Sequence, residues 1–381
     1  MRESELDAVR DYLGRHGQVP GPVEVGAALR NLGLLVSDAS VMQSVAALRR
    51  DSVGAGALDP LLEQPGVTDV LVNAPDEVYV DRGGGLEAAG VSFADEAEVR
   101  RLAVRLAASV GRRLDDGSPF VDARLPSGVR VHAVLGCVTG TGTCISLRVP
   151  NRQRLSLADW VASGSLSEAA AGLLDGLVRR RRAFLVSGGT GSGKTTLLAA
   201  LLSLVPATER IVIAEDSREL QPAHAHCVRL EARPANAEGV GAITLTDLVR
   251  QALRMRPDRL VVGEVRGAEL ADLLGALNTG HEGGCGTVHA NSAADVPARL
   301  EALGALGGLS RDALHAQLAA ALQVLVHVRR LPDGRRWLDE LRLVASDPAT
   351  GRCRTVPALR FVPGAAPEPG PGLAELERLV S

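Results

Sequence analysis

Apolar side chains recur at helical spacing through the first 60 residues of the chain. Three such segments, 3–16, 23–34 and 41–50, are separated by short stretches of Gly, Pro, Ser or Asp. Apolar residues that repeat every three or four positions form one face of a helix, and Gly and Pro interrupt helices. We therefore expect residues 1–60 to form a helical N-terminal region.

After this region the apolar residues alternate with polar ones, as they do in half-buried strands. The alternating segments are 68–73, 77–81, 128–134 and 143–149. Between the two pairs, residues 95–110 have the pattern of an amphipathic helix. Strands and a helix that each have an apolar face must bury those faces together, so we predict a small α+β domain over 61–149.

From residue 156 onward, short apolar runs alternate with helical segments. We interpret these runs as buried strands: 183–187, 210–215, 259–264, 286–289 and 323–328. Unbroken apolar strands separated by helices are typical of a mostly parallel sheet that is covered on both faces. The sequence therefore predicts an α/β domain over 156–362.

Two segments of different composition border this domain. The segment PNRQR at 150–154 is polar and follows the small domain directly, so we interpret residues 150–155 as a linker and a hinge. Residues 363–381 begin with PGAAPEPGPG and end in a short helix-like segment. We interpret them as a Pro/Gly-rich tail.

Composition limits the class of protein. Apolar residues make up 46 % of the 381 residues but aromatic residues only 2 %, so the core must be aliphatic. A net charge of −3 gives no general reason to expect nucleic acid as a partner. No apolar run reaches the roughly 20 residues that span a bilayer, and the N-terminus lacks a secretory signal pattern. We expect a cytoplasmic protein that reaches the membrane only peripherally, through partners.

The five cysteines stand singly, at positions 137, 144, 227, 285 and 353, without a CxxC pair. A disulfide framework or a zinc ribbon is therefore not expected. Two groups of residues come closest to a metal-binding pattern: His224, His226 and Cys227, and His281, Cys285 and His289. The second group runs through a Gly-rich segment, where helical spacing does not apply, and we expect no structural metal site at either place.

The candidate chemistry begins at the only lysine in the chain, Lys194. It lies in GGTGSGKT at 188–195, which has the GxxxxGKT pattern of a phosphate-binding loop. Backbone N–H groups of such a loop surround phosphates, and a compact ammonium reaches the β- and γ-phosphate oxygens as a point charge. The residues that we expect to contact ATP in this loop are Gly188, Gly189, Thr190, Gly191, Ser192, Gly193, Lys194, Thr195 and Thr196.

Hydrolysis at a phosphate loop also needs a magnesium ligand and a carboxylate that activates the attacking water. Thr195 follows the lysine and supplies the hydroxyl that usually binds Mg²⁺. Two predicted strands end in acids, Glu215 and Glu264. Ligands of an α/β sheet collect at the carboxyl ends of its strands, so both acids are expected to face the nucleotide. His289 ends a further strand and is a candidate sensor of the γ-phosphate.

Four motifs together resemble those of the secretion traffic ATPases of type II and type IV secretion and of type IV pili. They are GGTGSGKTT (188–196), IAEDSREL (213–220), LRMRPDRLVVGEVRGAE (253–269) and NTGHEGGCGTVHANS (278–292). They correspond to the Walker A, Asp box, Walker B and His box of that family. Three further stretches resemble the TadA/CpaF branch, which drives Flp-type pili: 67–84, 110–134 and 230–239.

The resemblance implies a RecA-like ATPase domain and a role for each matching residue. Glu215 matches the acid that activates water, Glu264 the Walker B acid that acts on Mg²⁺, and His289 the residue that contacts the γ-phosphate. Lys194 and Thr195 match the residues that hold the phosphates and Mg²⁺. The family also brings arginines of its N-terminal domain onto the nucleotide, and the matching candidates are Arg124, Arg130 and Arg148.

The resemblance further implies a homo-hexamer that hydrolyses ATP with Mg²⁺ and acts on inner-membrane platform proteins of a secretion or pilus system. Two other hypotheses remain open. The first is a nucleic acid translocase or helicase on a RecA-like core, although eight aromatic residues leave few for stacking on bases. The second is a scaffold whose assembly is controlled by ATP binding without turnover.

Overall fold

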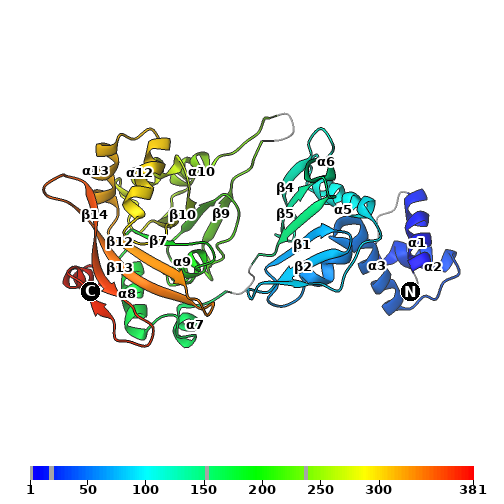
Figure 1. Cartoon of the computed structure of the whole chain (residues 1–381), viewed down its shortest axis with the longest axis horizontal. Coiled ribbons are helices and arrows are strands. Elements are labelled where there is room, and N and C mark those ends of the chain that lie inside the picture. Colours follow the sequence, from blue (N-terminus) through cyan, green and yellow to red (C-terminus); the bar gives the residue numbers. More distant parts are fainter. Residues whose placement is uncertain (1–2, 17–20, 151–153, 236–238) are drawn as a thin grey trace. The chain divides into compact units, whose positions relative to one another are not determined.

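The computed structural model describes residues 3–16, 21–150, 154–235 and 239–381 (Figure 1). Contacts divide the chain into two compact units, Met1–Asn151 and Arg152–Ser381. The predicted linker over 150–155 lies partly outside the described residues. No helix in the described ranges is both long enough and apolar enough to span a membrane.

The N-terminal unit begins with three helices, as the sequence predicts. They are α1 (Glu3–Arg15), α2 (Pro22–Asn31) and α3 (Asp38–Val53). Pro22 occupies the first turn of α2, where its missing N–H has no helical partner to lose. The helices share a small core of their own, which includes Val9, Leu29 and Leu48.

The rest of this unit is a six-stranded antiparallel sheet with one helix packed on it. The strands are β1 (Asp69–Ala74), β2 (Glu77–Asp81), β3 (Leu86–Ala88), β4 (Phe120–Arg124), β5 (Arg130–Val134) and β6 (Cys144–Arg148). Their order is β3-β2-β1-β6-β5-β4. Helix α5 (Glu96–Ser109) is capped by the Asp95 carboxylate and buries its apolar face against the sheet. Three short helical segments complete the unit: η1 (Gly56–Leu58), α4 (Asp59–Leu62) and α6 (Gly136–Thr139).

The C-terminal unit is built on a nine-stranded sheet in the order β15-β14-β13-β12-β7-β11-β10-β8-β9. Its strands are β7 (Phe184–Gly188), β8 (Ile211–Glu215), β9 (Cys227–Glu231), β10 (Arg259–Val265), β11 (Cys285–His289), β12 (Val324–Arg330), β13 (Arg336–Ser346), β14 (Cys353–Arg360) and β15 (Glu368–Pro369). The five strand pairs from β12 to β9 are parallel, and the three pairs from β12 to β15 are antiparallel. The predicted mostly parallel sheet, preceded by a smaller α+β unit and a helical region, is confirmed.

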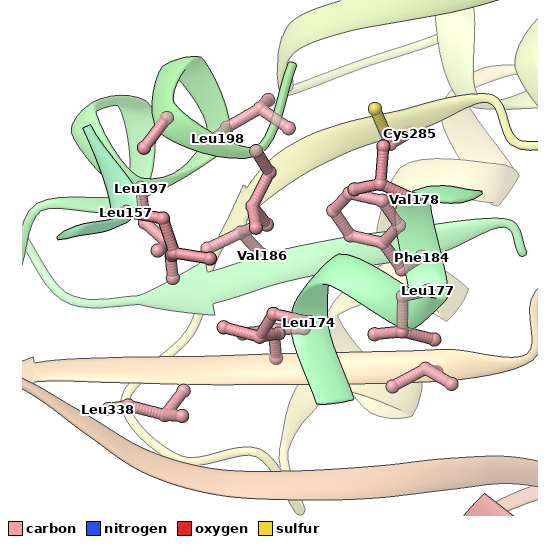
Figure 2. Close-up of a cluster of buried hydrophobic side chains, with 14 of the residues drawn as sticks. Leu157, Leu174, Leu177, Val178, Phe184, Val186, Leu197, Leu198, Cys285 and Leu338 are labelled. Atoms are coloured by element: carbon pink, nitrogen blue, oxygen red, sulfur yellow. The ribbon is translucent and has the colours of Figure 1, made fainter. Parts of the chain in front are cut away.

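Helices cover both faces of this sheet, and each face has a core of its own. One core takes side chains from α7 (Leu157–Ala162), α8 (Glu168–Arg179), α9 (Lys194–Leu202) and α14 (Leu373–Val380). Figure 2 shows Leu174 and Leu177 on one side of strand β7 and Leu197 and Leu198 nearby, all packed around Val186 and Phe184. The other core takes side chains from α10 (Leu245–Ala252), α11 (Glu269–Leu277), α12 (Val296–Leu306) and α13 (Arg311–Ala321). A 3₁₀ turn, η2 (Leu253–Met255), follows α10. As expected from the composition, both cores are almost wholly aliphatic.

The interpretation of the C-terminal segment as low-complexity linker material differs from the structure. Strand β15 pairs with β14, and α14 packs against α8 with Leu376 fully buried. A Cβ atom at Gly176 of α8 would lie 2.8 Å from the Cβ atom of Val380, so a glycine permits this close approach. Pro and Gly in 363–372 end strands and turn the chain, which local composition does not distinguish from a linker.

We expect Leu376→Ala to destabilise the C-terminal unit by about 2–5 kcal/mol, because it leaves a cavity between α14 and the sheet. Thermal and denaturant unfolding would measure the change. Glu377→Ala, at an exposed position on the same helix, is the matched control. Equal stability of the two variants would show that the packing of α14 contributes little.

Candidate functional site

The carboxyl ends of four neighbouring parallel strands form one edge of the nine-stranded sheet. In the order β7, β11, β10 and β8, these strands end at Gly188, His289, Val265 and Glu215. His289 lies directly opposite Gly188 in the register of β11 and β7. The four sequence motifs therefore converge on one edge, which is where α/β sheets bind ligands.

Glycines shape the loop between β7 and α9, which the sequence predicts to bind phosphate. A Cβ atom at Gly188 would lie 2.2 Å from the carbonyl oxygen of Val328 and 2.6 Å from the hydroxyl of Ser192, so only glycine fits there. Gly193 precedes α9 with φ +95°, a left-handed conformation that favours glycine. Helix α9 then begins at Lys194, so its free N–H groups face the loop.

Lys194 is 8 % exposed, and its ammonium lies over this loop. It donates hydrogen bonds to the carbonyl oxygens of Gly188 at 2.9 Å and Gly189 at 2.8 Å. Burial lowers the pKa of this ammonium, while the negative charge of Glu264 acts in the opposite direction. An anion that enters the loop would meet a desolvated positive charge that is already oriented by the backbone.

Glu215, at the end of β8, is almost fully buried, with 2 % of its surface exposed. Its Oε1 atom accepts hydrogen bonds from the backbone N–H groups of Glu219 at 3.0 Å and Leu220 at 2.9 Å. Its Oε2 atom is buried and has no hydrogen-bond partner among the described residues. Burial raises the pKa of this carboxyl group to about 7. A carboxyl group with a pKa near neutrality is suited to accept a proton at physiological pH.

The side chain of Glu215 packs directly over the backbone of β10. A Cβ atom at Gly263 would lie 2.6 Å from the Cγ atom of Glu215, so this contact requires a glycine immediately before Glu264. The hydroxyl of Thr287 on β11 donates to the carbonyl oxygen of Gly263 at 2.7 Å. Three adjacent strands therefore fix the two acids relative to each other.

Glu264 is partly exposed and forms an ion pair with Arg266, with 2.6 Å between Oε2 and Nη2. The Arg266 side chain is 59 % exposed, so the pair lies at the surface of the site and is weakly held. Thr195, the predicted magnesium ligand, lies half-buried in the first turn of α9. In the described part of the chain, no group of three or more His, Cys, Asp or Glu side chains is arranged to hold a metal ion.

A buried histidine that the sequence analysis did not identify connects two of the motifs. His327 on β12 lies 2.9 Å from the hydroxyl of Ser187, the residue before Gly188. It also makes a hydrogen bond with the backbone of Asn291, just beyond His289, and burial lowers its pKa. The imidazole thus connects the strand before this loop to the segment after the His box.

The three candidate arginines of the N-terminal unit form a row across its sheet. Arg124 on β4 lies opposite Arg130 on β5, and Arg130 lies opposite Arg148 on β6. Arg148 pairs with Asp69 of β1, with 3.3 Å between Nε and Oδ1. Residues directly opposite each other on neighbouring strands share a face of the sheet, so the three arginines belong to one face. The row belongs to the N-terminal unit, whereas the phosphate loop belongs to the C-terminal unit.

Comparison with known proteins shows the family to which the chain belongs. A family model described as type II/IV secretion system protein matches residues 51–356. The chain belongs to the type II/IV secretion system ATPase family. A Mycobacterium tuberculosis protein that carries a provisional conjugal-transfer name is 57 % identical over 328 residues, which cover 84 % of this chain and 93 % of the relative. Conjugal transfer protein TrbB of Rhizobium radiobacter is 32 % identical over 292 residues, which cover 75 % and 86 %.

A solved structure of the pilus retraction motor PilT with bound ADP is similar in fold to this secretion ATPase. The TM-score is 0.54 at 24 % sequence identity, and the match covers 74 % of this chain and 80 % of PilT. The family model and the sequence relatives confirm the predicted superfamily, and the structural match confirms the predicted fold class.

Proposed function

We propose that this chain is a Mg²⁺-dependent ATP hydrolase that works as a homo-hexameric motor of the TadA/CpaF branch, on inner-membrane platform proteins of a secretion or pilus system. The observation that carries the proposal is Glu215, a buried carboxyl group whose pKa is raised to about 7 at the same sheet edge as the phosphate loop. A nucleotide-binding scaffold would have no need of such a base. Family membership and the three N-terminal stretches at 67–84, 110–134 and 230–239 support the motor role and the branch.

In this proposal the phosphate loop binds the nucleotide, and the residues at the neighbouring strand ends act on the water and the γ-phosphate. The N–H groups at the start of α9 and the Lys194 ammonium bind the β- and γ-phosphates, with the ammonium exchanging the carbonyl oxygens of Gly188 and Gly189 for phosphate oxygens. Glu215 orients a water molecule through its free Oε2 atom and takes its proton. His289, at the end of the strand next to β7, contacts the γ-phosphate.

The residues present fit Mg²⁺ as the metal. The hydroxyl of Thr195 and the carboxylate of Glu264 are hard oxygen donors, and Mg²⁺ takes most of its other ligands from phosphate and water. When bound, the ion neutralises charge on the phosphates. The carboxylate of Glu264 would be able to bind the ion once its exposed ion pair with Arg266 opens.

The arginine row of the N-terminal unit supplies the remaining positive charge in this proposal. Guanidinium groups of Arg124, Arg130 and Arg148 stabilise the charge that develops on the transferred phosphoryl group. Their directly opposed positions, which bring the three residues to one face of that sheet, support a joint role for them. Measuring the mass of the purified protein with and without ATP tests the hexamer.

We expect Glu264→Gln to slow ATP hydrolysis by about 10- to 100-fold while leaving ADP affinity nearly unchanged, because the acid acts through the metal and its waters. Steady-state phosphate release and calorimetric ADP titration would measure the two effects. Glu368→Gln is the control, because Glu368 is exposed and lies on the edge strand β15, away from the four strands of the site. A Glu264→Gln variant with full activity would contradict the role of this acid.

The two alternative hypotheses make different predictions. A nucleic acid translocase would be stimulated by single-stranded DNA and not by membranes. A scaffold would bind ATP without turning it over. DNA stimulation or the absence of turnover would overturn the proposed function.

A further inference from the structure

A second pair of arginines lies beside the phosphate loop, within the same unit. Arg330 ends β12 and Arg336 begins β13, and the two residues are directly opposite each other in the register of these strands. The Nη1 atom of Arg330 would lie 4.0 Å from a Cβ atom at Gly191. The Cδ atom of Arg336 would lie 2.6 Å from a Cβ atom at Gly193. The turn between β12 and β13 therefore places the guanidinium of Arg330 near Gly191 and the aliphatic stem of Arg336 against Gly193.

Arg336 differs from two neighbouring arginines in having no counter-ion among the described residues. Arg335 pairs with Asp333 at 2.7 Å, and Arg329 pairs with Asp339 at 2.8 Å. Within the described ranges, the guanidinium of Arg336 has no carboxylate within ion-pair distance and no hydrogen bond. It is partly buried, and burial together with the positive charge of Arg330 lowers its pKa. A partly buried cation without a counter-ion is unfavourable, and an anion beside the loop would supply that counter-ion.

Trp160 of α7 lies close to the same glycine. This residue is 2 % exposed, and its Cη2 atom would lie 3.2 Å from a Cβ atom at Gly193. The space beside Gly193 is thus filled by an indole ring and by the aliphatic part of Arg336. Any larger residue there would push Arg336 away from the loop, so the glycine positions the cation as well as the backbone.

We propose that Arg336 is a phosphate-binding residue of the nucleotide site, supplied by the same chain as the phosphate loop, and that it contacts a phosphate group common to ADP and ATP. The inference rests on the proposed function, because it assumes that the loop binds a nucleotide. Gly193 is followed directly by Lys194 and the N–H groups of α9. A guanidinium beside this glycine can reach the phosphates that these groups bind.

The test compares ADP affinity among variants of the full chain by isothermal titration. Arg336→Gln is expected to weaken binding of both ADP and ATP by about tenfold or more, as the loss of a charge-assisted hydrogen bond does. Arg336→Lys keeps the charge and most of the stem and is expected to bind more tightly than Arg336→Gln. Arg335→Gln removes a neighbouring exposed guanidinium and is expected to bind as the wild type does.

The outcomes separate this inference from the proposed function. If Arg336→Gln binds ADP as tightly as Arg335→Gln while the wild type binds it normally, the inference is wrong and the nucleotide site stands. If the wild type binds no ADP, the proposed function fails first. The two tryptophans of the chain, Trp160 and Trp337, give a second readout. In a Trp337→Phe background, ADP is expected to change the fluorescence of Trp160, and Arg336→Gln is expected to shift the midpoint of that titration by the same factor. An unchanged midpoint would overturn the inference.

Discussion

Replacing Glu215 by glutamine is expected to reduce the rate of ATP hydrolysis by about a hundredfold or more, the usual loss when a general base is removed. Glutamine has the same shape, and its carbonyl oxygen can still accept the two backbone hydrogen bonds from Glu219 and Leu220. ADP affinity should therefore change little. Steady-state phosphate release and ADP titration measure the two quantities on the same preparation.

The raised pKa of Glu215 also predicts the pH dependence of the rate. Since its pKa is about 7, the carboxyl group takes up a proton as the pH falls through 7 and can no longer accept one from water. The wild-type rate should fall on the acidic side of this value. The residual rate of Glu215→Gln should not fall in this pH range. A Glu215→Gln variant that kept both the wild-type rate and the fall at acidic pH would contradict the role of Glu215.

The same substitution should stabilise the protein at alkaline pH. A buried carboxyl group whose pKa rises from 4.5 to about 7 binds its proton more tightly in the folded state. Its contribution to stability is present below pH 4.5 and is lost as the pH rises through 7, by about 3 kcal/mol in total. Glu215→Gln should therefore be more stable than the wild type at pH 8 and similar to it at pH 4. Equal unfolding curves at pH 8 would show that burial does not penalise this carboxylate.

Replacing Lys194 by alanine is expected to weaken ADP binding by about a hundredfold, in the range for losing one partner of a buried charged hydrogen bond. The ammonium is buried over the loop and is oriented by the carbonyl oxygens of Gly188 and Gly189. Lys194→Arg should not restore affinity, because a wide planar guanidinium does not fit the place of a compact ammonium. Calorimetric titration measures the affinities, with Arg335→Gln as the folded control.

Because Lys194 is the only lysine in the chain, its environment can be followed without mutation. A saturating nucleotide should protect it from an amine-reactive reagent, leaving the N-terminal amine as the other site of labelling. If Lys194→Ala bound ADP as the wild type does, or if nucleotide gave no protection, the phosphate loop would not be the nucleotide site.

The central part of the site could be predicted from sequence because it lies on buried parallel strands. Strands β7, β8, β10 and β11 are buried on both faces, so each appears in the sequence as a short, mostly apolar run with its functional residue at or next to the carboxyl end. The position of Glu215 and Glu264 at one sheet edge follows from parallel topology alone. The pKa of Glu215 did not follow, since it depends on the close packing against Gly263.

The parts that were missed depend on contacts between distant segments. Strand β13 alternates charged and apolar residues within a long hairpin, and its first residue, Arg336, gains its place beside Gly193 only through the pairing of β12 with β13. Trp160 reaches the same glycine from a short helix before β7. His327 lies in an apolar run that predicts a strand, but no local pattern indicates its contact with Ser187. Each would require knowledge of the strand order.

Phosphate release from ATP by the purified wild-type chain, with and without Mg²⁺, tests the central claim most directly. The account predicts turnover that requires Mg²⁺, disappears in Lys194→Ala and falls by about a hundredfold or more in Glu215→Gln. No Mg²⁺-dependent turnover by the wild type, or turnover that persists in Lys194→Ala, would contradict it.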